Sequence, residues 1–573
     1  MTAKAPHMNA IAAERNVRRR NRLYICFAVL SCVSMYLICS SSDTGDTLRY
    51  AGDIVHAGTF RRQWSDIGHL LWRPWGYVGL ELLGNVETMV FGDTPTQAVA
   101  RFLIWTNAIF SSAILALMWH LLRRIAPVQL ATMAIIPFFG TNCFLNYSML
   151  GSAYLPALFF EILALWLLIP RYGNRESGWK HSAAAGLAFA VCISLWLPYI
   201  CTVIGLIAAI FLWPKPTIPT QDQVSSASAR LAAFILALFV TSLLLFGTGA
   251  IASGITTPSQ FRNWIVQSQN GWSQNRNALR ILTGLPRAVY ELGGDTVVMK
   301  RYVFHDPSNP PSVFDVLGRL VLKLAIFYCG CLGVLVVLIR ERSARWILSI
   351  FGAAAAPLLF FAIVLFEPSS LSRYLPLLPF FYLAAVVALG FRDRNRLAAI
   401  AIAMLLISAP LFNVSALAEH RNTRLEAVRE RRAYLLKVLT NPATVYVVAG
   451  DDFYWLPLTR PLDHTIAPDG YGLQFAVETG SVHTSSWRSE FARQVLNDWT
   501  HGREVWISER LCRDRPLAFW GWIEGDDPRV HWSELPRFFN RFDTDLRSGP
   551  DSDGFLRVSE NTKNRSIIAA QGP

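Results

Sequence analysis

Long apolar stretches separated by short polar loops dominate the first three quarters of the chain. Nine of these stretches are continuous: residues 23–41, 98–122, 127–145, 153–170, 230–252, 316–339, 346–366, 374–390 and 397–413. An α-helix of about 20 residues crosses the ~30 Å of hydrocarbon in a bilayer. The pattern therefore predicts an α-helical polytopic membrane protein.

One further apolar stretch, residues 181–213, is too long for a single span and is broken at Leu197-Pro198-Tyr199. Proline removes a helical hydrogen bond, so two short spans that fold back as a hairpin fit this stretch better than one long helix. The predicted number of spans is therefore about eleven.

Basic residues fall into loops that this topology places on one side. They are Arg15, Arg18, Arg19, Arg20, Arg22, Arg123, Arg124, Arg171, Arg175, Lys180, Lys215, Arg340, Arg342, Arg345, Arg392, Arg394 and Arg396. The short opposite loops, 146–152 and 367–373, carry only Arg373. The positive-inside rule predicts a cytoplasmic N-terminus and an external C-terminal region, on the periplasmic face of the inner membrane if the source is bacterial. The first span is interpreted as a signal anchor, because apolar sequence continues to about Ile38.

Composition agrees with a membrane protein and argues against a nucleic-acid partner. Of the 573 residues, 53% are hydrophobic and 16% are charged, whereas soluble domains carry roughly 25% charged residues. The net charge of +13 would suggest nucleic acid in a soluble protein. Here much of the excess lies in the basic loops, where it faces anionic headgroups, so membrane lipids are the predicted partner.

Three segments on the predicted external side are long enough to build a site: residues 42–97, 253–315 and 414–573. The first contains amphipathic stretches at Thr47–Gly58 and Gly76–Val90 that suit the membrane surface. The third reads as a polar helix over 416–440, a strand at Thr444–Ala449, a helix at Trp487–Trp499 and strands at Glu504–Ser508 and Phe555–Val558. We therefore divide the chain into a transmembrane domain, 1–413, and an external α/β domain, 414–573.

Two aspartates, Asp43 and Asp46, follow the first span within one turn of the membrane. Their simplest interpretation is a solvated span terminus that also stabilises the start of a helix near Thr47. Two acids beside Gly45 at the mouth of a many-span bundle favour a functional role instead.

Cationic and aromatic residues are interleaved in the second external segment. Those with the chemistry of a site are Arg262, Trp264, Trp272, Arg276 and Arg280. Guanidinium groups bind phosphate oxygens in a bidentate manner, and tryptophan faces suit sugar rings. The alternative is an ordinary exposed loop, which does not explain an arginine excess on the side where topology does not require it.

The loop before the tenth span contains Glu367 and, at its end, Arg373-Tyr374. An arginine that enters a span from outside can extend its side chain to the interface, or it can face the bundle and bind a phosphate or an acid. The sequence leaves these two interpretations open.

Four motifs occur in a fixed order on this face: Asp43-Thr-Gly-Asp46, His69-Leu-Leu-Trp-Arg73-Pro74, the Gly186-containing broken hairpin, and Ser372-Arg373-Tyr374-Leu-Pro. Together they resemble the GT-C class of membrane glycosyltransferases, such as the protein O-mannosyltransferases and the lipid A aminoarabinose transferases. The resemblance implies a GT-C-like fold over residues 1–413.

The resemblance also implies inverting transfer of a sugar from a polyprenyl-phosphate donor to a hydroxyl of a glycan, lipid or protein acceptor. Asp43 or Asp46 would be the general base, with Asp43 preferred because it comes first after the span. Arg373 would bind the lipid phosphate, supported by His69, Arg73 and the loop arginines. Some relatives use a divalent metal, but no ligand cluster in this sequence requires one.

Two alternatives remain, one among related enzymes and one from another class of protein. An O-antigen ligase or polymerase would use a lipid-diphosphate donor and place paired arginines in one large external loop, for which residues 253–315 are a candidate. A lipid or solute transporter would carry ionisable residues near mid-span. The spans are nearly charge-free at their centres, which disfavours transport.

Overall fold

The computed structural model describes residues 5–39, 45–91, 95–169, 178–214, 226–267, 278–293, 311–366, 370–438, 444–447, 487–512, 536–548 and 554–571, with the single residues 295, 298, 299, 302 and 368. Asp43, Trp272, Arg276 and Glu367 lie outside the described residues.

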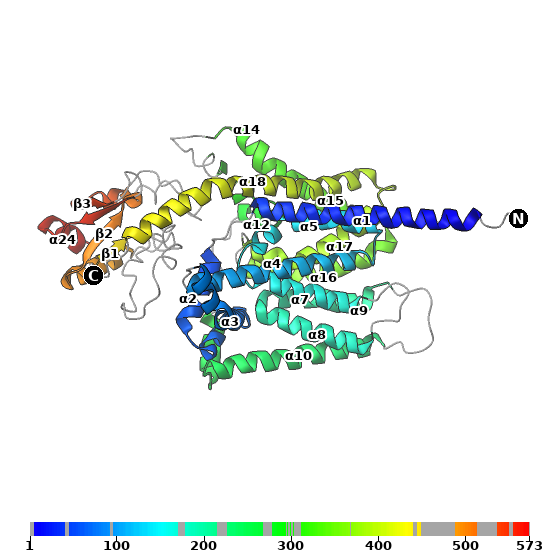
Figure 1. The fold of residues 1–573 in the computed structure, drawn as a ribbon, viewed down its shortest axis with the longest axis horizontal. Helices are drawn as coiled ribbons and strands as arrows, with labels where there is room; N and C mark the ends of the chain where they lie inside the picture. The colour runs from blue at the N-terminus through cyan, green and yellow to red at the C-terminus, as the bar shows by residue number, and fades with distance from the viewer. Residues whose placement is uncertain are drawn as a thin grey trace.

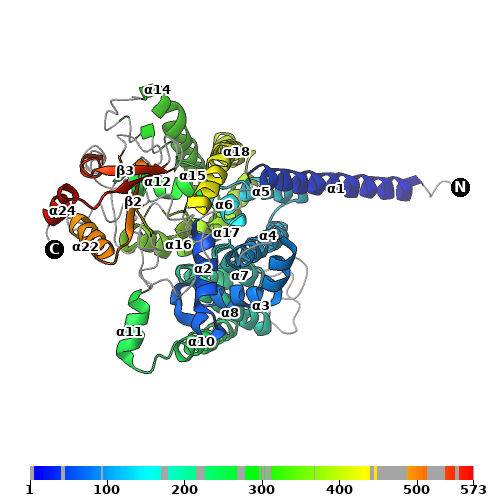
Figure 2. The same cartoon turned by 60° about the vertical axis from the view of Figure 1, so that its left-hand side comes forward.

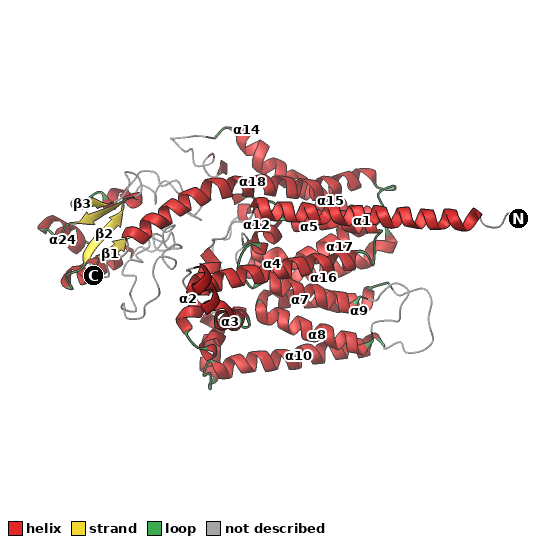
Figure 3. Cartoon of the chain, in the orientation of Figure 1, coloured by secondary structure: helices red, strands yellow, loops and turns green. Residues whose placement is uncertain are grey.

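Helices dominate the described part of the chain, and every predicted span is helical (Figure 3). The long apolar segments are Asn21–Cys39, Pro95–Leu122, Ala227–Ala252, Val313–Arg340, Arg342–Leu365, Leu371–Leu389 and Arg396–Ala418. They contain helices α1 (Ala5–Cys39), α4 (Pro95–Leu122), α10 (Ala227–Ala252), α14 (Val313–Val316), α15 (Leu322–Arg340), α16 (Arg345–Phe360), α17 (Leu378–Leu389) and α18 (Arg396–Val438). The number of true membrane crossings stays a prediction.

The remaining predicted spans are bent or short. Helices α5 (Val128–Phe139) and α6 (Asn142–Ser148) meet at 71° and together form one broken segment. The shorter apolar helices are α7 (Tyr154–Leu168), α8 (Trp179–Leu195) and α9 (Val203–Leu212), which follows the 3-10 segment η3 (Leu197–Thr202). The predicted hairpin break is present, and it starts at Trp196, whose backbone is extended (φ −153°, ψ 108°).

The basic turns lie together at one end of the bundle, which we call the basic end. Arg394 on the turn after α17 makes an ion pair with Glu341 on the turn after α15, at 3.4 Å. At the same end, Arg124 donates to the carbonyl of Trp166 (2.7 Å). Helix α1 projects beyond the bundle here (Figure 1). Whether this end is cytoplasmic remains a prediction from charge.

The opposite end, the site end, carries the shorter helices of the first two predicted external segments. These are α2 (Gly45–Ala57), η1 (Phe60–Ser65), η2 (Ile67–His69), α3 (Trp72–Phe91), α11 (Pro258–Gln267) and α12 (Ala278–Val289). Both amphipathic stretches of the first segment are helical, and α3 starts four residues earlier than predicted. Helices α2 and α3 pack on each other and on α4, and α11 lies near the end of α10 (Figure 2).

Helix α18 continues without a break through the predicted domain boundary at 413/414. Its 43 residues measure about 65 Å at 1.5 Å per residue. A membrane span needs only ~30 Å of this length, so the rest extends beyond the bundle toward the C-terminal sheet (Figure 1).

The described residues of the C-terminal region include a four-stranded sheet in the order β1-β2-β4-β3, in which β1 and β2 are parallel and the other two pairs are antiparallel. The strands are β1 (Thr444–Val447), β2 (Glu504–Ser508), β3 (Thr544–Ser548) and β4 (Phe555–Val558). Helix α22 (Trp487–Thr500) comes before β2 and packs on it, and α24 (Thr562–Ala569) follows β4 and packs on α22. Phe491, Val505 and Phe539 are buried in its core. On its outer side Arg557 bridges Glu504 and Asp545, each at 2.8 Å, and holds the pKa of the Asp545 carboxyl below its usual value. The predicted strands are confirmed, and the polar strand β3 was missed.

Candidate functional site

The turn between α6 and α7 is the point on which the first external segment is fixed. Thr47, in the first turn of α2, is buried and accepts a hydrogen bond from the Gly151 N–H (2.8 Å). The indole of Trp72, at the start of α3, donates to the Gly151 carbonyl (3.1 Å). From the other side, the buried amide of Asn107 donates to the Ser152 carbonyl (2.8 Å). The start of α2, with Asp46 directly before Thr47, is therefore held against the α6–α7 turn.

Five aromatic side chains gather beside this turn and form the aromatic cluster: Tyr50, His69, Tyr147, Tyr154 and Trp196. Ring centroids are 5.4 Å apart for Tyr50–His69 and 5.7 Å for His69–Tyr154. Tyr154 lies 4.7 Å from both Tyr147 and Trp196. The His69 ring is fixed by a 3.1 Å contact between Nδ1 and the Leu195 carbonyl. The cluster joins α2, η2, the α6–α7 turn and the hairpin break.

Arg373 extends the aromatic cluster to the loop before the tenth span. It lies on η7 (Leu371–Leu377), and its guanidinium carbon is 5.0 Å from the Trp196 ring centroid and 3.9 Å from the Phe366 ring centroid. Phe366 follows directly after the π-helical end of α16, Phe361–Leu365. A guanidinium stacked on aromatic faces is stabilised electrostatically and is held in one plane. Arg373 is thus half-buried against these two rings, and Trp196 and Tyr154 connect it to His69.

Tyr374 and helix α12 hold the η7 segment in place. The Tyr374 side chain is buried, and its hydroxyl donates to the Pro368 carbonyl (2.7 Å). Gly284 of α12 packs directly on this contact: an added Cβ would lie 2.0 Å from the Pro368 oxygen and 2.6 Å from the Tyr374 hydroxyl. Only glycine fits at this contact between α12 and the segment that carries Arg373. Arg280 is buried on the same helix.

Replacing Gly284 by alanine is therefore expected to displace η7 and to lower the melting temperature. The added methyl meets a backbone oxygen, which cannot move aside as a flexible side chain can. Gly352→Ala in α16 is the matched control, because nothing lies within 4 Å of its added Cβ. The measurement is the melting temperature of both variants and the parent in detergent. Equal melting temperatures of Gly284→Ala and Gly352→Ala would contradict the close contact at Gly284.

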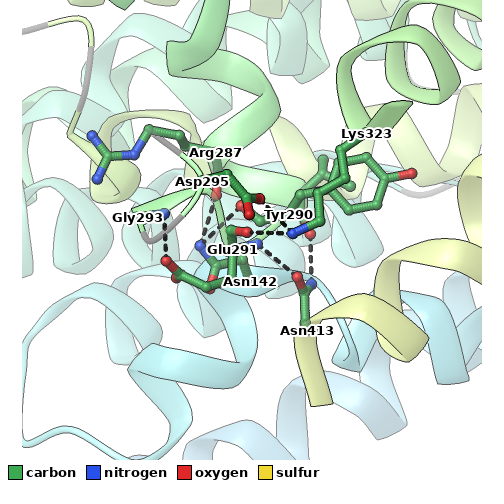
Figure 4. A network of polar contacts seen from close by, with 9 residues as sticks. Asn142, Arg287, Tyr290, Glu291, Gly293, Asp295, Lys323 and Asn413 are labelled. Atoms are coloured by element: carbon green, nitrogen blue, oxygen red, sulfur yellow. Dashed lines mark hydrogen bonds and ion pairs between the residues drawn. The ribbon is translucent and has the colours of Figure 1, made fainter. Parts of the chain in front are cut away.

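A buried polar network anchors the C-terminal end of α12 (Figure 4). Asn142 donates to the carbonyls of Arg287 (2.8 Å) and Tyr290 (3.2 Å). Asn413 of α18 donates to the Val289 carbonyl (2.7 Å) and accepts from the Glu291 N–H (2.7 Å). These amides satisfy backbone groups that a helix end leaves without intrahelical partners.

The same network contains a buried ion pair. The Lys323 ammonium lies 2.6 Å from an Asp295 carboxylate oxygen and 3.0 Å from the Glu291 carbonyl (Figure 4). Breaking such a pair leaves a buried charge and is strongly destabilising. Lys323 therefore ties the chain after α12 to α15, and α12 has a fixed position relative to the bundle.

Other predicted site residues form a second group around Ser65. Arg73 donates to the Ser65 hydroxyl and to the Asp53 carbonyl, both at 3.2 Å. The buried Trp264 indole donates to the Ser65 carbonyl (2.6 Å). Arg262 is exposed on α11. The structure brings His69 and Arg373 together through the aromatic cluster, whereas Arg73 and Trp264 meet at Ser65.

Metal ligands are not grouped within the described ranges: no three histidine, cysteine, aspartate or glutamate side chains there could hold an ion together. Dependence on a divalent metal is therefore tested by measuring activity with and without a chelator.

Comparison with known proteins gives matches by structure only. No family model and no curated protein matches the sequence. ArnT from Cupriavidus metallidurans, in a crystal structure bound to undecaprenyl phosphate, matches with a TM-score of 0.51 and 11% identity over 94% of this chain and 98% of that one. The chain has the fold of ArnT. This is the GT-C fold predicted from the sequence.

Further matches are also by structure, at low sequence identity. ArnT in the apo state matches with a TM-score of 0.51 over 97% of this chain and 99% of that one, at 11% identity. An oligosaccharyltransferase from Archaeoglobus fulgidus, in complex with zinc and sulfate, gives a TM-score of 0.47 at 15% identity, over 96% of this chain and 76% of that one.

Proposed function

We propose that the chain is a membrane glycosyltransferase that transfers a sugar from a polyprenyl-phosphate donor to an acceptor hydroxyl of a glycan, lipid or protein on the external face. The observation that carries the proposal is the stacking of Arg373 on Trp196 and Phe366, in contact with the aromatic cluster that includes His69. A fixed cation beside aromatic rings suits a ligand that combines a phosphate with a sugar.

The fold of ArnT gives independent support. The ArnT structure contains undecaprenyl phosphate, a polyprenyl phosphate. A shared fold alone does not establish a shared activity. The proposal for this chain therefore rests on Arg373 and the aromatic cluster together with the fold.

In the proposed reaction the acceptor oxygen attacks the anomeric carbon, and the bond from this carbon to the phosphate oxygen breaks. The acceptor proton passes to a carboxylate, Asp43 or Asp46, which acts as general base. The polyprenyl phosphate leaves with the electron pair of the broken bond, and Arg373 stabilises its charge. Attack from the side opposite the phosphate inverts the anomeric configuration.

The supporting roles follow from position and chemistry. His69 is a hydrogen-bonding group within the aromatic cluster, and Tyr374 holds the segment that carries Arg373. We assign Arg73, Arg262, Trp264 and Arg280 to the borders of the donor and acceptor sites. Glu367, Trp272 and Arg276 stay sequence-based candidates for substrate contacts.

The test is donor turnover by the purified full-length protein in nanodiscs. A panel of labelled sugars is supplied on polyprenyl monophosphate and on polyprenyl diphosphate, with and without a chelator, and free lipid phosphate is measured. We expect consumption of a monophosphate donor. Turnover of diphosphate donors alone would indicate a ligase or polymerase. Movement of intact donor across the bilayer without cleavage would indicate a transporter.

A further inference from the structure

Glu161 is a buried acid deep in the bundle that the proposed reaction does not use. It lies on α7, two helical turns from Tyr154, and its side chain is 0% exposed. None of the ion pairs among the described residues involves it. The titratable groups that interact with it are Cys192 and Tyr199, and neither is a cation. A lone ionised carboxylate at this depth would be costly.

The hydrogen bonds around Thr202 show how this cost is avoided. The Thr202 hydroxyl oxygen lies 2.5 Å from Glu161 Oε1 and 2.9 Å from the Tyr199 carbonyl oxygen. The hydroxyl has one proton, and a carbonyl oxygen can only accept. If Thr202 donates to Tyr199, the proton in the bond to Glu161 must come from the carboxyl group. Both bonds form only when Glu161 is protonated.

The second carboxyl oxygen supports this assignment. Glu161 Oε2 is buried and has no hydrogen-bond partner among the described residues. As the carbonyl oxygen of a neutral acid it costs far less to bury than as one half of a charged carboxylate.

Thr202 is the last residue of η3, the segment that forms the hairpin break. Trp196 lies directly before η3, and Arg373 stacks on it. The Tyr199 hydroxyl donates to the Tyr154 carbonyl (3.1 Å) at the site end of α7. Helix α7 therefore holds η3 at two depths, through Tyr154 near the site and through Glu161 farther in.

We propose that Glu161, as a neutral carboxylic acid, is a positioning residue: its hydrogen bond to Thr202 fixes η3 against α7 and so sets Trp196 beneath the Arg373 guanidinium. This inference rests on the proposed function and deepens it, because it assigns the geometry of the phosphate-binding arginine to a buried acid.

The decisive comparison is Glu161→Gln against Glu161→Met. Glutamine can donate to Thr202 as the neutral acid does, so its donor KM should stay within about twofold of the parent value. Methionine has a similar size but cannot donate, so the donor KM should rise about tenfold, with a smaller change in kcat. Thr202→Ser should keep the donor KM near the parent value, as Glu161→Gln does. Thr202→Val should raise the donor KM, as Glu161→Met does. Combining Glu161→Met with Thr202→Val should add little, since both remove one interaction.

Ile162→Ala is the stability control. Ile162 is equally buried and next in sequence, so this variant should lower the melting temperature while leaving the donor KM unchanged. Loss of activity in Glu161→Gln equal to that in Glu161→Met would overturn the proposal in favour of an ionised role. An unchanged KM in both Glu161→Met and Thr202→Val would reduce Glu161 to a packing residue.

Backbone hydrogen exchange of residues 196–202 gives a readout that does not depend on glycosyl transfer. Exchange in this segment should rise in Glu161→Met and Thr202→Val and remain at the parent level in Glu161→Gln. If the parent protein turns over no donor, the proposed function fails while this exchange pattern still tests the link from Glu161 to the break. If exchange does not differ among the variants, the positioning role fails whatever the activity.

Discussion

Arg373→Ala is expected to lower kcat/KM for a polyprenyl-phosphate donor by about 10²–10³-fold, the usual loss when one preorganised group that stabilises developing charge is removed. The guanidinium is fixed between Trp196 and Phe366, so its orientation does not have to be found anew in each turnover. Alanine removes the positive charge and leaves two aromatic faces without their cation.

Arg373→Lys separates charge from geometry. Lysine keeps the positive charge but is a point charge that neither stacks on the rings as a plane nor binds a phosphate in a bidentate manner. We expect it to recover part of the loss, mainly in KM. Arg394→Ala is the control: this arginine is largely exposed at the basic end and pairs there with Glu341. Donor kinetics are measured for all three variants. Parent-like kinetics in Arg373→Ala would remove Arg373 from the site.

The transmembrane architecture was predictable because a bilayer restricts the chain so strongly. Backbone groups in hydrocarbon must bond within their own helix, so each apolar run of sufficient length becomes a helix. Pro198 predicted the hairpin break for the same reason, since it removes one of these bonds. Strand β3, Thr-Asp-Leu-Arg-Ser, was missed because four of its five residues are polar and because, among the described strands, it lies at the edge of the sheet beside β4.

The candidate site was predictable only in part. His69 and Arg373 stand out in sequence because a polar residue beside a span is costly unless it has a partner, water or a function. Trp196 and Phe366 do not, since an aromatic residue in an apolar run is indistinguishable from core. Their meeting with Arg373 depends on the hairpin break and on the π-helical end of α16. Glu161 does not stand out in the sequence, because a single acid leaves its long apolar run nearly free of charge.

The grouping around Ser65 illustrates a different limit. Arg73 and Trp264 have side chains suited to phosphate and sugar, and their role as substrate contacts stays a prediction from residue type. Both are hydrogen-bonded to Ser65, which holds η1 against α3 and α11. Residue type indicates what a side chain can bind, whereas its partner depends on contacts between segments far apart in sequence.

Asn substitution of the two aspartates after the first span tests the proposed general base. We expect one of Asp43→Asn and Asp46→Asn to lower kcat by about 10²–10⁴-fold, the usual contribution of a general base. The donor KM should change little, because in the proposed reaction Arg373, and not the base, binds the phosphate. Asp46 lies in the first turn of α2, directly before Thr47.

The pH dependence distinguishes a base from a helix-stabilising residue. A base must be deprotonated to act, so kcat of the parent falls as the pH drops through the pKa of this carboxylate, and the Asn variant lacks this acid limb. Asp393→Asn, an exposed acid on the turn after α17, is the matched control and should follow the parent curve. If both Asp43→Asn and Asp46→Asn keep the parent kcat and its acid limb, these residues only stabilise the start of α2. The proton acceptor would then have to be sought elsewhere on the site end, beginning with Asp53 of the same helix.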